Sequence, residues 1–355
     1  MLSDLFEGRQ SMNTAAASFD RLPKGLSAEL VDSLNRIASV AKDLSYVISI
    51  GDISDEVQNQ TAVNSDGDDQ KPLDVYADEA YLEKMKNSSI RLYASEEQPT
   101  VLDLGGNGTL ALAIDPLDGS SNIDTNVSIG SIFSIRSIPS NFVIDSENAK
   151  SVFLSPGSDQ IAAGYVIFGP QTVIVLTVGD GILTYVLDRV KNIFVESKRE
   201  TSIPADTREY AINASNARHW EKRMKNYIDD SIAGKSGPRG MDFNMRWVAS
   251  LVAETHRILS RGGIFIYPAD SRKGYEKGRL RMVYECAPIA FLIEQAGGSA
   301  TDCYNRLMDL SVSELHQRTP FAFGSKNEIV RLQAYNDLPE AEVSPLFRKR
   351  GLFNS

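Results

Sequence analysis

Acidic residues follow directly on two short apolar segments in the first half of the chain. Residues 91–95 run into Glu96 and Glu97, and residues 110–114 run into Asp115. Both segments have the length of strands, and ligands bind beyond strand ends in sheets whose strands are joined by helices. If the two strands are neighbours, these carboxylates converge at one edge of the sheet.

Helical and extended patterns alternate along the chain, which predicts a mixed α/β fold class. Apolar residues between 30 and 48 recur at helical spacing, and Ser27 is the predicted N-cap. A charged stretch near residue 200 marks the boundary between an N-terminal domain (1–200) and a C-terminal domain (201–335), with a tail at 336–355. Other helices are predicted at 75–86, 219–228, 245–260 and 288–296, and strands at 127–136, across 161–195 and at 263–267.

Charge and cysteine content exclude several classes of protein. The chain has 355 residues, of which 47 are acidic and 37 basic, for a net charge of −10. That balance disfavours nucleic acid and anionic membranes as partners. Two separated cysteines, Cys286 and Cys303, give neither a disulfide framework nor a zinc motif. The most apolar stretch, 165–187, is interrupted by glycines and a proline, so we expect no membrane span and a cytoplasmic protein.

The segment Asp115-Pro116-Leu117-Asp118-Gly119-Ser120-Ser121 has the composition of a ligand-binding loop. Pro116 fixes one backbone dihedral and Gly119 permits a tight turn, so two carboxylates are held close together. Gly119, Ser120 and Ser121 could begin a short helix or form an anion-binding turn. In either case their backbone N–H groups could donate hydrogen bonds to a phosphate. An isolated Asp-Gly pair is ordinary turn chemistry, but the full string predicts metal ligands beside a phosphate site.

A cluster that combined Glu96 and Glu97 with this loop would need cations. Two unit charges about 4 Å apart repel by roughly 4 kcal/mol at an effective dielectric near 20. Carboxylate oxygens are hard ligands that suit Mg²⁺ or Mn²⁺, and no nearby histidine or cysteine favours zinc.

Four more acidic residues have ordinary explanations beside functional ones. Asp68, Asp69 and Asp74 lie in or beside a polar loop over 59–71. Glu285 precedes the predicted helix at 288–296, where its charge could simply complement the helix N-terminus.

Basic residues suited to an anionic ligand occur in the second half. Arg279 and Arg281 alternate along an extended segment, so both point to one face. A guanidinium group matches the geometry of phosphate, although a solvated edge strand has the same pattern. Arg246, beside Trp247, could add another anion contact or merely pack.

Three motifs resemble those of the fructose-1,6-bisphosphatase family, within the lithium-sensitive, metal-dependent sugar phosphatases. The first runs from Asp115 through Asn122 to Gly130, and the second from Arg279 to Glu285 and on to Pro288 and Gly298. The third is Gly262 to Pro268. The resemblance covers roughly residues 27 to 335 and identifies the chain as a bacterial-type member. It implies a layered α-β-α-β-α sandwich of two domains, assembled as a homotetramer.

The resemblance also implies roles for individual residues. Two or three Mg²⁺ or Mn²⁺ ions would be held by Glu96, Glu97, Asp115, Asp118, Glu285 and the Leu117 carbonyl. The attacking water would be oriented or deprotonated by Asp74, Glu97 and one of Asp68 and Asp69. The backbone at Gly119, Ser120 and Ser121 would hold the reacting phosphate. The rest of a sugar bisphosphate would be bound by Asn213, Tyr267, Arg279 and Arg281. Arg246 would reach the site of a neighbouring subunit.

Several positions depart from the family pattern. Many members carry lysine at Arg279 and tyrosine at Asn216 and Trp247. The family's AMP site is altered at 24–27 and at 109–110, where a threonine-rich loop and a Lys-Tyr pair are expected.

The implied activity is hydrolysis of D-fructose 1,6-bisphosphate to D-fructose 6-phosphate. A sedoheptulose-1,7-bisphosphatase or a dual-specificity enzyme is the near alternative. An inositol monophosphatase or nucleotide phosphatase is disfavoured by the continuation Ser120-Ser121-Asn122. An acidic, non-catalytic cation-binding protein is disfavoured because every expected carboxylate is present.

Overall fold

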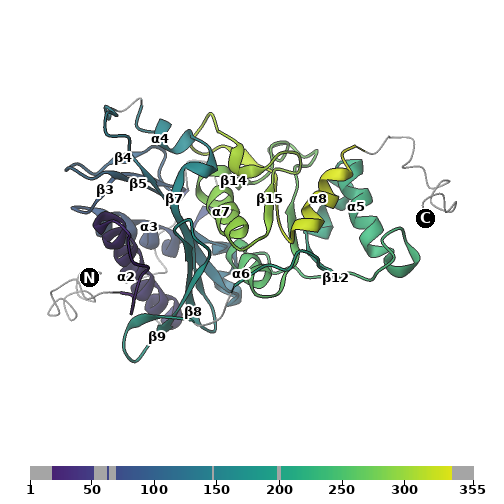
Figure 1. The fold of residues 1–355 in the computed structure, drawn as a ribbon, viewed down its shortest axis with the longest axis horizontal. Coiled ribbons are helices and arrows are strands. Elements are labelled where there is room, and N and C mark those ends of the chain that lie inside the picture. Colours follow the sequence, from purple (N-terminus) through teal and green to yellow (C-terminus); the bar gives the residue numbers. More distant parts are fainter. Residues whose placement is uncertain (1–17, 52–61, 64–68, 146–147, 198–200, 338–355) are drawn as a thin grey trace. The chain divides into compact units, whose positions relative to one another are not determined.

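The computed structural model describes residues 18–51, 62–63, 69–145, 148–197 and 201–337 (Figure 1). Contacts divide the chain into two compact units. Unit 1 comprises Met1–Leu154, Gln160–Glu200 and Ser250–Val252, and unit 2 comprises Ser155–Asp159, Thr201–Ala249 and Ala253–Ser355. Each unit combines helices with a mixed sheet, which confirms the predicted mixed α/β class.

Unit 1 is built on an eight-stranded sheet. Its neighbouring strands are antiparallel except β3 and β5, which run parallel. In spatial order the strands are β10 (Ile193–Glu196), β9 (Leu183–Asp188), β8 (Thr172–Thr177), β7 (Gln160–Phe168), β6 (Ile129–Ser137), β5 (Leu110–Asp118), β3 (Ile90–Ser95) and β4 (Leu102–Asp103).

Two helices, α2 (Ala28–Ile50) and α3 (Pro72–Met85), pack on each other and against this sheet (Figure 1). Helix α2 begins as predicted, because the Ser27 hydroxyl accepts the Leu30 N–H at 3.2 Å. Most of its apolar stripe, including Leu34 and Leu44, is buried in the core of unit 1, and Ile48 is partly buried against that core. Helix α3 begins three residues before the predicted start, since Pro72 supplies a backbone dihedral suited to the first helical turn.

The shorter elements of unit 1 lie around this framework. The polar loop predicted over 59–71 contains a two-residue antiparallel pair, β1 (Ala62–Val63) with β2 (Asp69–Gln70). A single helical turn, α4 (Ser151–Leu154), contacts β5.

Unit 2 has a five-stranded sheet covered by helices. The strands, in order, are β12 (Asn244–Met245), β11 (Glu209–Ala211), β13 (Ile264–Tyr267), β17 (Phe321–Gly324) and β15 (Ser299–Thr301). Its helices are α5 (Lys222–Ile232), α6 (Leu251–Arg261, which starts in unit 1), α7 (Ala287–Gln295) and α8 (Lys326–Ala334). A separate two-stranded sheet pairs β14 (Leu280–Arg281) with β16 (Arg318–Thr319).

Two predicted helices of this half have different limits in the structure. The helix predicted at 245–260 begins only at Leu251, because Met245 pairs with Tyr210 in the sheet and Ala249 has a φ of 61°. The helix predicted at 219–228 is α5, displaced toward the C-terminus, because residues Ala214–His219 form a separate 3₁₀ turn. Over the part of the chain that the structure describes, no helix has the length and apolar character needed to cross a membrane.

Candidate active site

The parallel pairing of β3 and β5 brings two acidic segments to one edge of the sheet in unit 1. Ser95 is in register with Ile114, and the Glu96 N–H donates to the Ile114 carbonyl at 3.0 Å. Glu96 and Glu97 therefore leave β3 beside the point at which Asp115 follows Ile114 on β5. The two strands predicted from the sequence are neighbours, as convergence of their carboxylates requires.

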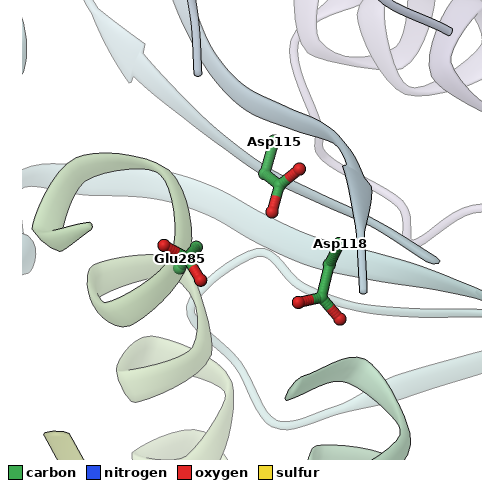
Figure 2. Close-up of side chains that lie close together, drawn as sticks. All are labelled: Asp115, Asp118 and Glu285. Atoms are coloured by element: carbon green, nitrogen blue, oxygen red, sulfur yellow. The ribbon is translucent and has the colours of Figure 1, made fainter. Parts of the chain in front are cut away.

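Asp115 and Asp118 are buried carboxylates on β5, with exposed fractions of 3% and 8% (Figure 2). Each contributes a carboxylate oxygen, and the two lie within 4.8 Å of one another. Asp115 accepts the Leu117 N–H at 3.0 Å, and Asp118 accepts the Val252 N–H at 2.9 Å. Burial raises the pKa of Asp118 to about 6, although the N–H donor opposes the rise by stabilising the carboxylate.

The loop that carries these carboxylates is fixed by its own sequence. Gly119 has a φ of 78°, a backbone conformation that glycine adopts without the strain another residue would have. A short 3₁₀ helix, Ser120–Thr125, follows directly. Behind the loop, the Ser131 hydroxyl donates to the Pro116 carbonyl at 2.8 Å and accepts the Tyr81 hydroxyl at 3.1 Å.

Asp74 lies close to both Glu97 and the loop. Its carboxylate is 3% exposed and accepts the Lys71 N–H at 2.9 Å. Burial raises the pKa of Asp74 to about 7; the charge of Glu97 adds to the rise, whereas the Lys71 N–H and the Ser120 hydroxyl reduce it. A carboxylate with a pKa near the operating pH has the property required of a general base.

The other two acids predicted for this role have no described side chain. Asp68 lies outside the described residues. Asp69 is placed by its backbone in β2, in register with Val63. The choice between them as the loop acid stays a prediction.

The donor set of unit 1 fits a divalent cation. Asp118 has no basic partner among the described residues, only N–H and hydroxyl donors. Two buried carboxylates this close repel each other, and a cation between them offsets both the repulsion and the loss of hydration. Carboxylate oxygens are the ligands that Mg²⁺ and Mn²⁺ prefer.

Unit 2 contains a pocket between β13, the 3₁₀ turn Ala214–His219 and the loop after β13. Asn213 and Tyr267, both predicted to bind substrate, line it together with Asn216, one of the positions that depart from the family pattern. The complete lining is Ile212, Asn213, Asn216, Trp220, Ile266, Tyr267, Pro268 and Asp270.

Four further predicted residues occupy defined positions in unit 2. Glu285 lies in the π-helical turn Met282–Cys286 before α7, is 6% exposed (it is labelled in Figure 2), and accepts the Arg281 N–H at 2.6 Å. Arg281 itself is 6% exposed and lies on β14, which begins directly after Arg279. Arg246 is half exposed, and its guanidinium lies 3.5 Å from Glu209.

Some contributors to the site have no signal in the sequence. The Val252 N–H that holds Asp118 comes from the start of α6, 134 positions further along the chain. The Ser131 hydroxyl beneath Pro116 lies on β6 and reads as an ordinary strand residue. Only the fold brings these donors to the loop.

The α/β architecture, with buried carboxylates and a glycine-serine loop beyond a strand end, is that of a phosphatase. Residues 19–199 match the family model described as fructose-1-6-bisphosphatase, N-terminal domain, and residues 203–337 match the model of the C-terminal domain. The chain belongs to the fructose-1,6-bisphosphatase family.

Individual relatives agree with this assignment. The chain is 53% identical over 337 residues to fructose-1,6-bisphosphatase class 1 1 of Cereibacter sphaeroides, covering 95% of this chain and 99% of the relative. It is 53% identical over 331 residues to fructose-1,6-bisphosphatase class 1 of Rhodobacter capsulatus, covering 93% and 98%. The crystal structure of Leishmania major fructose-1,6-bisphosphatase in holo form superposes with a TM-score of 0.83 at 33% identity, covering 89% of this chain and 96% of that one.

Proposed function

We propose that the chain hydrolyses D-fructose 1,6-bisphosphate to D-fructose 6-phosphate and phosphate, as a phosphoric monoester hydrolase. The observation that carries this is 53% identity over 95% of the chain to a protein named fructose-1,6-bisphosphatase. Residues 1–200 form the metal-binding domain, residues 201–335 the sugar-phosphate domain and 336–355 a tail. The product serves gluconeogenesis or a carbon-fixation cycle in the cytoplasm.

The family depends on divalent metal ions, and two or three Mg²⁺ or Mn²⁺ ions are proposed for each subunit. The ligands are Glu96, Glu97, Asp115, Asp118, Glu285 and the carbonyl of Leu117. When bound, such ions polarise phosphoryl oxygens and lower the pKa of a coordinated water. The buried, closely spaced carboxylates of Asp115 and Asp118 support this ligand set.

The proton of the attacking water passes to a carboxylate. Asp74 is proposed to accept or orient it together with Glu97 and with Asp68 or Asp69. A pKa of about 7 for Asp74 lets that side chain hold a proton near neutral pH and release it afterwards.

The same loop is proposed to hold the phosphate that reacts. Backbone N–H groups at Gly119, Ser120 and Ser121 would donate to its oxygens, since consecutive N–H groups at a turn bind anions. Asn213, Tyr267, Arg279 and Arg281 would bind the sugar and the second phosphate. Arg246 would serve a neighbouring subunit of a homotetramer.

Phosphate release from purified protein tests the activity. With Mg²⁺ or Mn²⁺ present, we expect turnover of D-fructose 1,6-bisphosphate with kcat/KM at least ~10-fold above that of D-fructose 1-phosphate, since missing polar contacts to a second phosphate cost binding energy. The panel includes sedoheptulose 1,7-bisphosphate, because the residues Asp124-Thr125-Asn126 leave that substrate open. Absence of phosphate release from the fructose bisphosphate with either metal would contradict the proposal.

AMP is expected to inhibit weakly or not at all. The family's threonine-rich AMP loop is replaced at 24–27, where Ser27 is used as the N-cap of α2, and the Lys-Tyr pair reads Thr109-Leu110. Turnover should therefore be nearly unchanged by millimolar AMP in a steady-state assay. Cooperative inhibition by micromolar AMP would show that the chain has a functional nucleotide site.

A further inference from the structure

The loop after β13 is organised around Tyr275. The Tyr275 carbonyl accepts two N–H groups, from Asp270 at 3.1 Å and from Gly278 at 3.0 Å, and the Tyr275 N–H donates to the Arg272 carbonyl at 2.9 Å. Gly278 has a φ of 83°, and a Cβ there would lie 2.3 Å from the Thr319 backbone, so the loop is tightly packed where it enters β14. Because main-chain groups make these bonds, the backbone of Tyr275 is fixed independently of the contacts of its ring.

Two guanidinium groups lie over that ring. The central guanidinium carbon is 4.1 Å from the ring centroid for Arg272 and 4.8 Å for Arg279. Both distances fall within the range of cation–π attraction. The Tyr275 hydroxyl is in addition hydrogen-bonded to the Arg279 guanidinium. The single side chain of Tyr275 thus contacts both arginines.

The two arginines differ in how their charge is balanced. Arg272 donates to both oxygens of Asp270, at 3.0 and 3.1 Å from its Nε, and Asp270 is 6% exposed. Arg279, by contrast, has no acidic partner among the residues that the structure describes; its contacts are with Tyr275. The group of Asp270, Arg272 and Arg279 therefore carries a net charge of +1, which resides on Arg279.

This charge lies beside the pocket of unit 2. Burial raises the pKa of Tyr267, and the charge of Arg279 is the largest influence opposing the rise. Tyr267 and Asp270 both line the pocket, whose other polar lining groups, Asn213 and Asn216, are uncharged. Because Arg272 neutralises Asp270, the excess charge at this pocket is the positive charge of Arg279, and uncharged hydrogen-bonding groups beside a guanidinium can bind a phosphate group.

We propose that Tyr275 is a positioning residue that holds the Arg279 guanidinium for the phosphate of the substrate that is not hydrolysed. Arginine has four side-chain torsions, and a stacked, hydrogen-bonded fork loses less conformational entropy on binding than a free one. Tyr275 does not touch the ligand. The inference rests on the proposed function, because it assigns the second phosphate of a bisphosphate substrate to this pocket.

Replacement of Tyr275 tests the proposal through a split between KM and kcat. Tyr275→Leu removes the stacking surface and the hydroxyl, and should raise KM for D-fructose 1,6-bisphosphate by about 10-fold with kcat within about 2-fold of the wild type. Tyr275→Phe keeps the stack and should raise KM by only about 3-fold. D-fructose 1-phosphate, which lacks the second phosphate, should be hydrolysed equally well by wild type and by both variants.

Equilibrium binding of D-fructose 6-phosphate by calorimetry gives a second readout that does not depend on turnover. Tyr275→Leu should weaken it by about 10-fold, and in an Arg279→Lys background the same change should have little further effect, because Tyr275 acts through Arg279. Tyr304→Phe, at an exposed tyrosine bonded to Glu221, is the matched control and should behave as wild type. Loss of kcat on both substrates, or unchanged binding of D-fructose 6-phosphate, would overturn the positioning role. Failure of the wild type to hydrolyse the bisphosphate would instead overturn the proposed function, and the binding experiment would still decide the role of Tyr275.

Discussion

Asp118→Asn should lower the turnover of D-fructose 1,6-bisphosphate by about 10³-fold while leaving the protein folded. Metal ions contribute several kcal/mol of charge stabilisation to a phosphoryl-transfer transition state, and each 1.36 kcal/mol corresponds to a factor of ten in rate. An amide in place of the buried carboxylate removes one negative charge from Asp118 and Asp115, the pair proposed to bind metal. Steady-state phosphate release at saturating Mg²⁺ and Mn²⁺ measures the loss.

The fold should survive this substitution for a structural reason. The Asn amide oxygen can accept the Val252 N–H that Asp118 accepts at 2.9 Å, so no buried donor loses its partner. Circular dichroism and urea unfolding check that expectation. Asp103→Asn is the matched control, because Asp103 lies on the edge strand β4, pairs with Arg91 and should keep full turnover. Wild-type activity of Asp118→Asn would show that this carboxylate is not a metal ligand.

Local sequence patterns were sufficient to predict the framework that carries these carboxylates. The stripe of Leu34 and Leu44 after Ser27 predicted α2, because an N-cap and a helical repeat are local properties. The limits of α6 could not be predicted in the same way. Residues 245–250 contain apolar side chains compatible with a helix, yet Met245 pairs with Tyr210, a contact between distant segments that overrides local preference.

The candidate site shows the same division between local and long-range information. The composition of the loop at 115–121 indicated two carboxylates on a turn, and the structure gives their burial and their separation. The Val252 N–H, the Ser131 hydroxyl and the stacking of two arginines on Tyr275 were not predictable, because each depends on residues that become neighbours only through tertiary packing or loop conformation. Residue type therefore predicted candidate groups for the chemistry, but not the groups that contact and orient those candidates.

Asp74→Asn should lower turnover by about 10²–10³-fold and at the same time stabilise the metal-free protein at pH 8. The first effect follows from loss of a carboxylate that can accept a proton from the attacking water. The second follows from the raised pKa of Asp74, about 7 against an ordinary value of 3.8. Between these two values the folded protein keeps a proton that the unfolded chain has released, so its stability falls as the pH rises through this window.

The substitution removes that penalty, because an amide stays neutral at every pH. Urea unfolding in EDTA should show a gain in the free energy of unfolding of up to about 4 kcal/mol at pH 8, which shrinks toward zero near pH 4. Asp103→Asn should shift stability in the opposite direction at pH 8, since a hydrogen bond from Arg91 lowers the pKa of Asp103 and its ionised form favours the folded state. If Asp74→Asn raised the free energy of unfolding equally at pH 4 and pH 8, the gain would not come from removing the buried charge of Asp74. A gain confined to the higher pH, together with the loss of turnover, would show that the site maintains a destabilising charge that catalysis uses.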